Sequence, residues 1–132
     1  MDRAWKENPE EERGFAMKEE AYRAAGIDYA QGLERFMGNA ELDQQFLSQF
    51  LYDGSFEEFW AGMEMGDLQM AEKAIHTLKG TAGNLSMIRL FELSDEIVEA
   101  LREGKTAEEI RTLIYETREV YEKICDAIRQ NA

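Results

Sequence analysis

Apolar residues recur along most of the chain at the spacing of one face of a helix, and no stretch shows the strict alternation of a half-buried strand. Leu90, Leu93, Ile97 and Leu101, for example, follow one another at intervals of three and four. The chain has one proline, Pro9, so the remaining residues are free to form helices. The pattern predicts an all-α fold.

Residues that favour helix ends divide this pattern into segments. Short connections between helices favour antiparallel neighbours, so we expect an up-down antiparallel four-helix bundle with additional short N-terminal helices. The first predicted helix begins at Asn8-Pro9, the second runs from Asp28 to about Met37, and the third follows Asn39 and ends at Tyr52-Asp53-Gly54. The fourth runs from a Ser55–Glu58 capping box to Gly66, and the fifth spans about 68–84 after Asp67. The sixth runs from a Ser86 cap to Gly104, and the seventh runs from a Thr106–Glu109 capping box to near the C-terminus.

The first predicted helix differs from the others because its apolar face is irregular. We therefore predict residues 1–25 to be an accessory N-terminal segment and residues 26–132 to form the bundle domain. For the aromatic residues of the middle of the chain we favour a core over a ligand pocket, because they recur at helical spacing. The packing residues expected there are Leu33, Phe36, Leu42, Phe46, Leu47, Phe50, Phe56, Phe59, Trp60 and Met63.

The charge balance limits the possible partners. The chain has 28 acidic and 15 basic residues and a formal net charge of -13, which repels nucleic acids and anionic membranes, so we expect neither as a partner. Clusters such as Glu10–Glu12 favour solvated helix starts over cation sites, and we expect no metal and no cofactor. With one cysteine, Cys125, in an apolar stripe and no apolar run of about 18 residues, a cytoplasmic protein is expected.

The only histidine of the chain lies in the segment that carries the candidate chemistry. On a helical wheel, His76 is roughly 160° from the direction of Leu78, so it is expected to face solvent. The apolar residues opposite form a coherent core stripe. They are Ala71, Ala74, Ile75, Leu78, Ala82 and Leu85.

Glycines and lysines surround this histidine. A glycine on an exposed helical face costs about 1 kcal/mol relative to alanine, so Gly80 and Gly83 call for a reason other than helix stability. Access for a macromolecular partner is such a reason, and Lys73 flanks the same surface. Near neutral pH a histidine offers a ring nitrogen lone pair, and Lys79 can neutralise part of the charge of a phosphoryl group. The alternative that His76 is a surface residue without a function remains open at this point.

The run His76-Thr77-Leu78-Lys79-Gly80, continuing to Gly83-Asn84-Leu85, resembles the signature of histidine-containing phosphotransfer (HPt) domains, and the resemblance covers about residues 26–132. It implies a helical bundle in which His76 is the phosphoacceptor and Lys79 pairs with the charge of the phosphoryl group. It also implies that Gly80 leaves space for a partner to approach. It implies response-regulator receiver domains and hybrid histidine kinases as partners. The family usually has glycine where this chain has Ser86.

Two other functions compete with a phosphocarrier. The sequence has no Gly-rich nucleotide loop and no second histidine, so we expect no autonomous kinase activity. A helical adaptor that binds signalling partners without being phosphorylated would share the fold. An acid–base enzyme that uses His76 ranks below both, because an exposed helix face offers no pocket for a small substrate.

Overall fold

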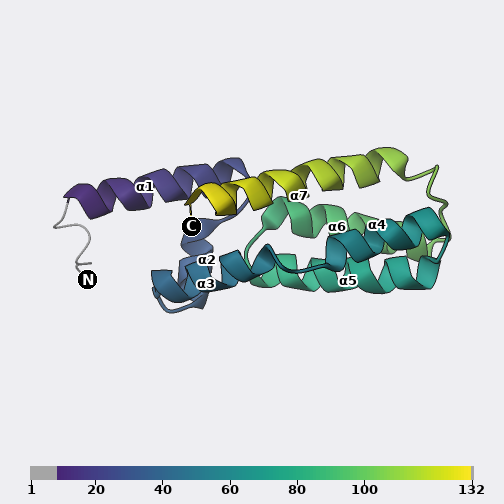
Figure 1. The fold of residues 1–132 in the computed structure, drawn as a ribbon, viewed down its shortest axis with the longest axis horizontal. Coiled ribbons are helices and arrows are strands. Elements are labelled where there is room, and N and C mark those ends of the chain that lie inside the picture. Colours follow the sequence, from purple (N-terminus) through teal and green to yellow (C-terminus); the bar gives the residue numbers. More distant parts are fainter. Residues whose placement is uncertain (1–8, 132) are drawn as a thin grey trace.

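The computed structural model describes residues 9–131, and within them the chain forms helices joined by short connections (Figure 1). The predicted all-α fold is confirmed. The first helix, with 16 residues, is longer than the short helix expected. The helices are α1 (Pro9–Ala24), α2 (Tyr29–Arg35), α3 (Ala40–Phe50), α4 (Ser55–Met65), α5 (Leu68–Asn84), α6 (Ile88–Arg102) and α7 (Arg111–Asn131).

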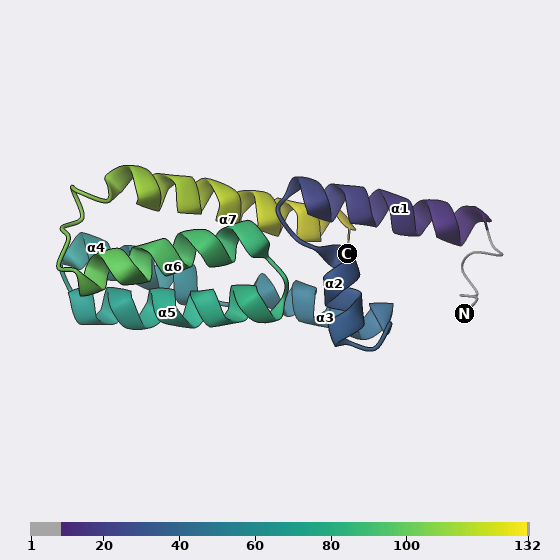
Figure 2. The same ribbon diagram turned by 180° about the vertical axis from the view of Figure 1, so that it is seen from behind.

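Helices α4 to α7 alternate in direction and form the predicted up-down bundle, with α3 leading into α4 at one end (Figures 1 and 2). Helix α5 packs most extensively, against α4 on one side and α6 on the other. The α4–α5 contact is close, since a Cβ on Gly62 would lie 2.8 Å from the backbone nitrogen of Ala71. Two backbones can approach this closely only where a side chain is absent.

The N-terminal helix extends past the bundle and lies beside the C-terminal part of α7 in both views (Figures 1 and 2). Tyr22 of α1 is fully buried in the same core cluster as the bundle residues. The following segment is held by a backbone bridge between Ile27 and Met87, and the Asp28 amide donates to the Ser86 carbonyl at 2.8 Å. The division of the chain at residue 25 stays a prediction.

The residues that precede three of the predicted helices act as N-terminal caps, as predicted for Asp67. The side chains of Asp28, Asn39 and Asp67 accept hydrogen bonds from the backbone amides of Gln31, Leu42 and Met70, respectively. The capping box between Thr106 and Glu109 also forms, but it closes a turn that precedes α7, which begins at Arg111. The cap expected at Asn8 lies outside the described residues.

Two other predicted caps are wrong. No side chain caps α4; Asp53 instead accepts from the Ser55 amide at 2.8 Å, so the Ser55–Glu58 box does not form. At α6 the cap residue is Met87, and Ser86 is 1% exposed with a φ of 57° and no partner for its hydroxyl. This left-handed backbone favours glycine. Ser86 therefore belongs to a tight turn, and the turn explains why glycine suits this position.

The predicted packing face of α3 is partly wrong. Leu47 and Phe50 are buried as expected, whereas Leu42 and Phe46 are 36% and 40% exposed. The residue that occupies the interior in their place is Asp43, which is 2% exposed. Helix α3 packs against α2 and α7 at the end of the bundle, and within residues 9–131 the backbone of no further helix comes close enough to cover its other side. Among the other expected core residues, Phe36, Trp60, Met63 and Leu101 are only partly buried.

The carboxyl of Asp43 is buried in the core without a full set of hydrogen bonds. Its Oδ2 has no hydrogen-bond partner, and its Oδ1 lies 3.1 Å from the position that a Cβ on Gly32 would take. Burial raises the pKa of Asp43 from 3.8 to about 6, against the opposing charge of Lys18. Burial, assisted by this neighbouring carboxyl, raises the pKa of Tyr29 to about 12.

Replacement of Gly62 by alanine should destabilise the protein by about 1–3 kcal/mol, because the methyl group would meet the backbone of α5. Chemical denaturation measures the effect. Gly14→Ala is the matched control, since Gly14 is a helical glycine with open space around it and should gain up to about 1 kcal/mol. Equal stability changes in the two variants would show that the α4–α5 contact is not close.

Asp43→Asn should stabilise the protein most at alkaline pH. A folded pKa of about 6 lies above the unfolded value of 3.8, so the ionised side chain costs stability above the folded pKa. The gain should be roughly 1–3 kcal/mol near pH 8, shrink as the pH falls through about 6 and vanish near pH 4. Denaturation midpoints measured across this range test it. A gain that does not change with pH would assign the effect to packing alone.

Candidate functional site

Helix α5 fixes the direction of the histidine through the burial of its opposite face. Ala71, Ala74, Ile75, Leu78 and Ala82 are all buried, and Asp67 caps the first turn. His76 lies opposite this stripe and is exposed, as the helical wheel predicts. Rotation of α5 would therefore expose its apolar stripe, so core packing holds the imidazole toward solvent.

Few side-chain atoms project from the helix surface next to His76 on the side of the following turn. Gly80 is exposed, and a Cβ placed on it would meet no atom within 4 Å. The hydroxyl of Thr77 donates to the Lys73 carbonyl at 3.0 Å, and that of Thr81 donates to the Thr77 carbonyl at 3.2 Å. Both threonines keep their polar atoms against the helix, so they add little height to this face. Neither threonine was among the predicted site residues.

Lys79 is directed toward α6. Its Nζ lies 2.8 Å from Oδ1 of Asp95 and 5.7 Å from the centre of the Phe91 ring. The predicted charge partner of a phosphoryl group is thus in an ion pair in the free protein. Lys73, by contrast, is exposed in the preceding turn of α5.

Gly83 lies at the packed edge of this surface. A Cβ on Gly83 would be 3.2 Å from a ring carbon of Phe91, so the glycine lets the aromatic ring lie against α5. Close packing of α5 on α6 therefore accounts for this glycine. Its predicted role in partner docking stays a prediction.

The ion pair of Lys79 belongs to a regular antiparallel seam between α5 and α6. Glu72 pairs with Arg102 at 3.3 Å and Lys79 pairs with Asp95, while Gly83 faces Phe91. Residue numbers rise along α5 as they fall along α6, about the turn that contains Ser86. Asp95 was not among the predicted site residues, although counting residues outward from this turn places it opposite Lys79.

On the other side of this face, beyond Thr81 and Asn84, lies an apolar groove of about 540 Å³. Its far wall comes from α2 and α3, where the rings of Phe36 and Phe46 stack with centres 5.0 Å apart. Tyr52 lies on its rim and is 89% exposed. The groove places exposed aromatic surface beside the C-terminal end of α5.

Apart from the exposed Arg89, whose pKa is raised by its hydrogen bond to Glu116, the other titratable groups with shifted pKa values lie in the core. Cys125 is buried as predicted, and burial raises the pKa of its thiol. Burial likewise raises the pKa of Tyr121, which donates to Glu57 at 3.1 Å. In the part of the chain that the structure describes, no group of three or more His, Cys, Asp or Glu residues is placed to hold a metal ion. Within residues 9–131, no helix combines the length and the apolar character needed to cross a membrane.

Comparison with known families agrees with this geometry. A model of the Hpt domain family matches residues 31–131. This match covers most of the chain, so the protein belongs to the Hpt domain family, whose members carry phosphoryl groups in phosphorelay signalling and interact with receiver domains and histidine kinases. No curated protein and no solved structure matches the chain.

Proposed function

We propose that this protein is a phosphorelay intermediate that accepts a phosphoryl group on His76 from the aspartate of one receiver domain and passes it to another. The exposure of the only histidine on a low face of α5, in a member of this family, is the observation that carries the proposal. The partners are response-regulator receivers and the receiver domains of hybrid histidine kinases. A reducing cytoplasm suits the single, unpaired Cys125.

The transfer requires little of the protein beyond presentation of the imidazole. A ring nitrogen of His76 gives its lone pair to a new N–P bond, the P–O bond to the receiver aspartate breaks, and the electron pair of that bond stays on the carboxylate. The second ring nitrogen keeps its proton or releases it to solvent. The receiver supplies the Mg²⁺ and most of the catalytic groups. The protein is therefore a substrate and carrier without kinase activity of its own.

The surroundings of His76 suit an approaching domain. The open space over Gly80 lets a receiver bring its aspartate to the imidazole, and the exposed Lys73 lies on the same face. The groove beside Thr81 and Asn84 gives a receiver apolar contacts, including the partly exposed ring of Phe46. An adaptor that is never phosphorylated could use the same groove, so acceptance of phosphate separates the two functions.

The change His76→Gln should abolish phosphate acceptance and leave the unfolding midpoint almost unchanged. An exposed side chain of this kind contributes no more than about 0.5 kcal/mol to stability. The assay incubates the parent and the variant with phosphorylated receiver domains and measures acid-labile, alkali-stable phosphate on the chain. Phosphate on the variant would contradict the assignment, and a parent that binds receivers without accepting phosphate would favour the adaptor.

Two changes at Gly80 separate docking from folding. Gly80→Ala should stabilise the free protein by up to about 1 kcal/mol, because the position is helical and exposed. Gly80→Gln should also fold, but its longer side chain would stand beside the imidazole where a receiver approaches. Transfer from a phosphorylated receiver should fall in Gly80→Gln, while phosphorylation by the small donor phosphoramidate should fall less. Equal receiver transfer in both variants would contradict the clearance role.

A further inference from the structure

The lysine nearest to the proposed phosphorylation site is already bound to an acidic residue of the next helix. Lys79 and Asp95 form an ion pair of 2.8 Å, with side chains 26% and 44% exposed, respectively. The Phe91 ring lies 5.7 Å from the ammonium and covers part of the lysine. The ammonium thus has an anionic and an aromatic contact on α6.

The fold fixes the position of this acidic residue. On α6, Leu93, Ser94, Ile97 and Val98 are fully buried, so the helix cannot rotate to carry Asp95 away. Gly83 lets the Phe91 ring lie against α5, and the Glu72–Arg102 pair holds the far end of the same helix pair. Asp95 is therefore held opposite Lys79 by the packing of α5 on α6.

A phosphoryl group on His76 would compete for the same ammonium. It adds about -1.5 to -2 charges three residues before Lys79 on one helix, and residues at this spacing are neighbours on the helix surface. Because the ammonium of Lys79 is drawn toward Asp95, a turn toward the phosphoryl group weakens its ion pair with Asp95. The proton stays on the lysine, and no covalent bond changes in this exchange.

We propose that Asp95 is a positioning residue, which, given the proposed function, holds Lys79 away from His76 and limits how strongly the phosphorylated imidazole is stabilised. Asp95 touches neither the phosphoryl group nor the receiver in this role. It acts through Lys79 alone. Its effect is to keep the phosphohistidine reactive, so that the phosphoryl group passes on to a receiver.

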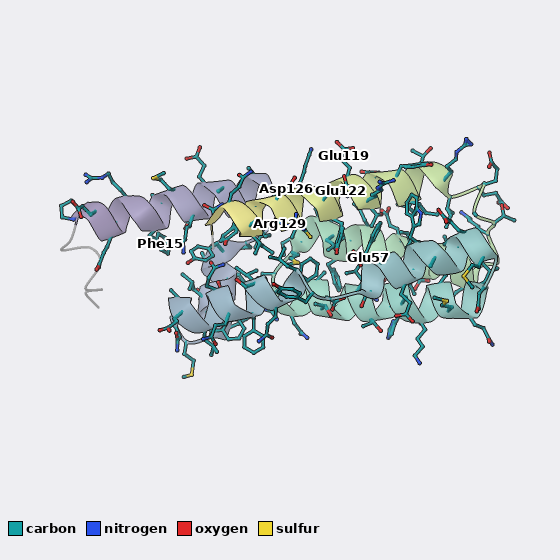
Figure 3. All side chains as sticks on the ribbon, viewed as in Figure 1. Phe15, Glu57, Glu119, Glu122, Asp126 and Arg129 are labelled. Carbon is teal, nitrogen blue, oxygen red and sulfur yellow. The ribbon has the colours of Figure 1, made fainter. Side chains whose placement is uncertain are left out.

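The change Asp95→Asn tests this role. It leaves Lys79 without its competing carboxylate, so the equilibrium between a phosphorylated receiver and phosphorylated His76 should shift toward His76 by about two- to fivefold, the range expected for an ion pair of this exposure. The control is Asp126→Asn, the same substitution in the exposed Asp126–Arg129 pair on α7 (Figure 3). Helix α7 packs on α6 and not directly on α5. The control should leave the equilibrium unchanged.

A double-variant cycle decides whether Asp95 acts through the lysine. In the Lys79→Met background, Asp95→Asn should have no effect on the equilibrium. An equal shift with and without Lys79, no shift at all, or a shift toward the receiver would overturn the proposal. NMR of the Lys79 ammonium in the unphosphorylated protein adds a readout independent of transfer, and Asp95→Asn should make this group more mobile. Failure of the parent to accept phosphate would overturn the proposed function, whereas an immobile ammonium in Asp95→Asn would overturn the positioning role alone.

Discussion

Burial of one apolar stripe of α5 is the constraint on which the rest of the structure depends. The stripe is built largely from small residues, so α4 can approach α5 until Gly62 touches the backbone at Ala71. The same packing on α6 sets the register of the seam in which Lys79 meets Asp95. His76 is exposed because it lies opposite the stripe. Orientation of the imidazole, approach of the neighbouring helices and placement of the lysine are thus three results of one buried surface.

The net charge of the molecule also affects the site at His76. The chain carries a net charge of -13, and the outward face of α7 presents Glu119, Glu122 and Asp126 (Figure 3). The lysine one turn after the imidazole, Lys79, is in an ion pair with Asp95. A phosphoryl group at His76 would therefore add negative charge to a chain that already carries an excess of it. Under the proposed function this excess suits a carrier that must release the phosphoryl group, because a strongly stabilised phosphohistidine would not pass it on.

The sequence predicted those features that depend on periodicity within one helix. The stripe of α5, the exposure of His76 and the cap at Asp67 all follow from residues close together in the chain. Features set by the register between helices were missed, namely the Lys79–Asp95 pair, the Phe91 ring against Gly83 and the inward turn of Asp43. Ser86 was misassigned as a cap because its left-handed backbone is set by the contact between its turn and the segment at Ile27. The role of His76 itself depends on partners and stays a prediction.

The pairing of α1 with α7 has a consequence for the order in which the molecule assembles. Helices α4, α5 and α6 contact their immediate neighbours in the chain, so each contact closes a short loop. The contact between α1 and α7 closes a loop of nearly the whole chain, which carries the largest entropic cost of closure. Local contacts tend to form fastest, so we expect the α1–α7 contact to form after the contacts among α4, α5 and α6. The surface that carries His76 can therefore be complete before the two ends of the chain meet.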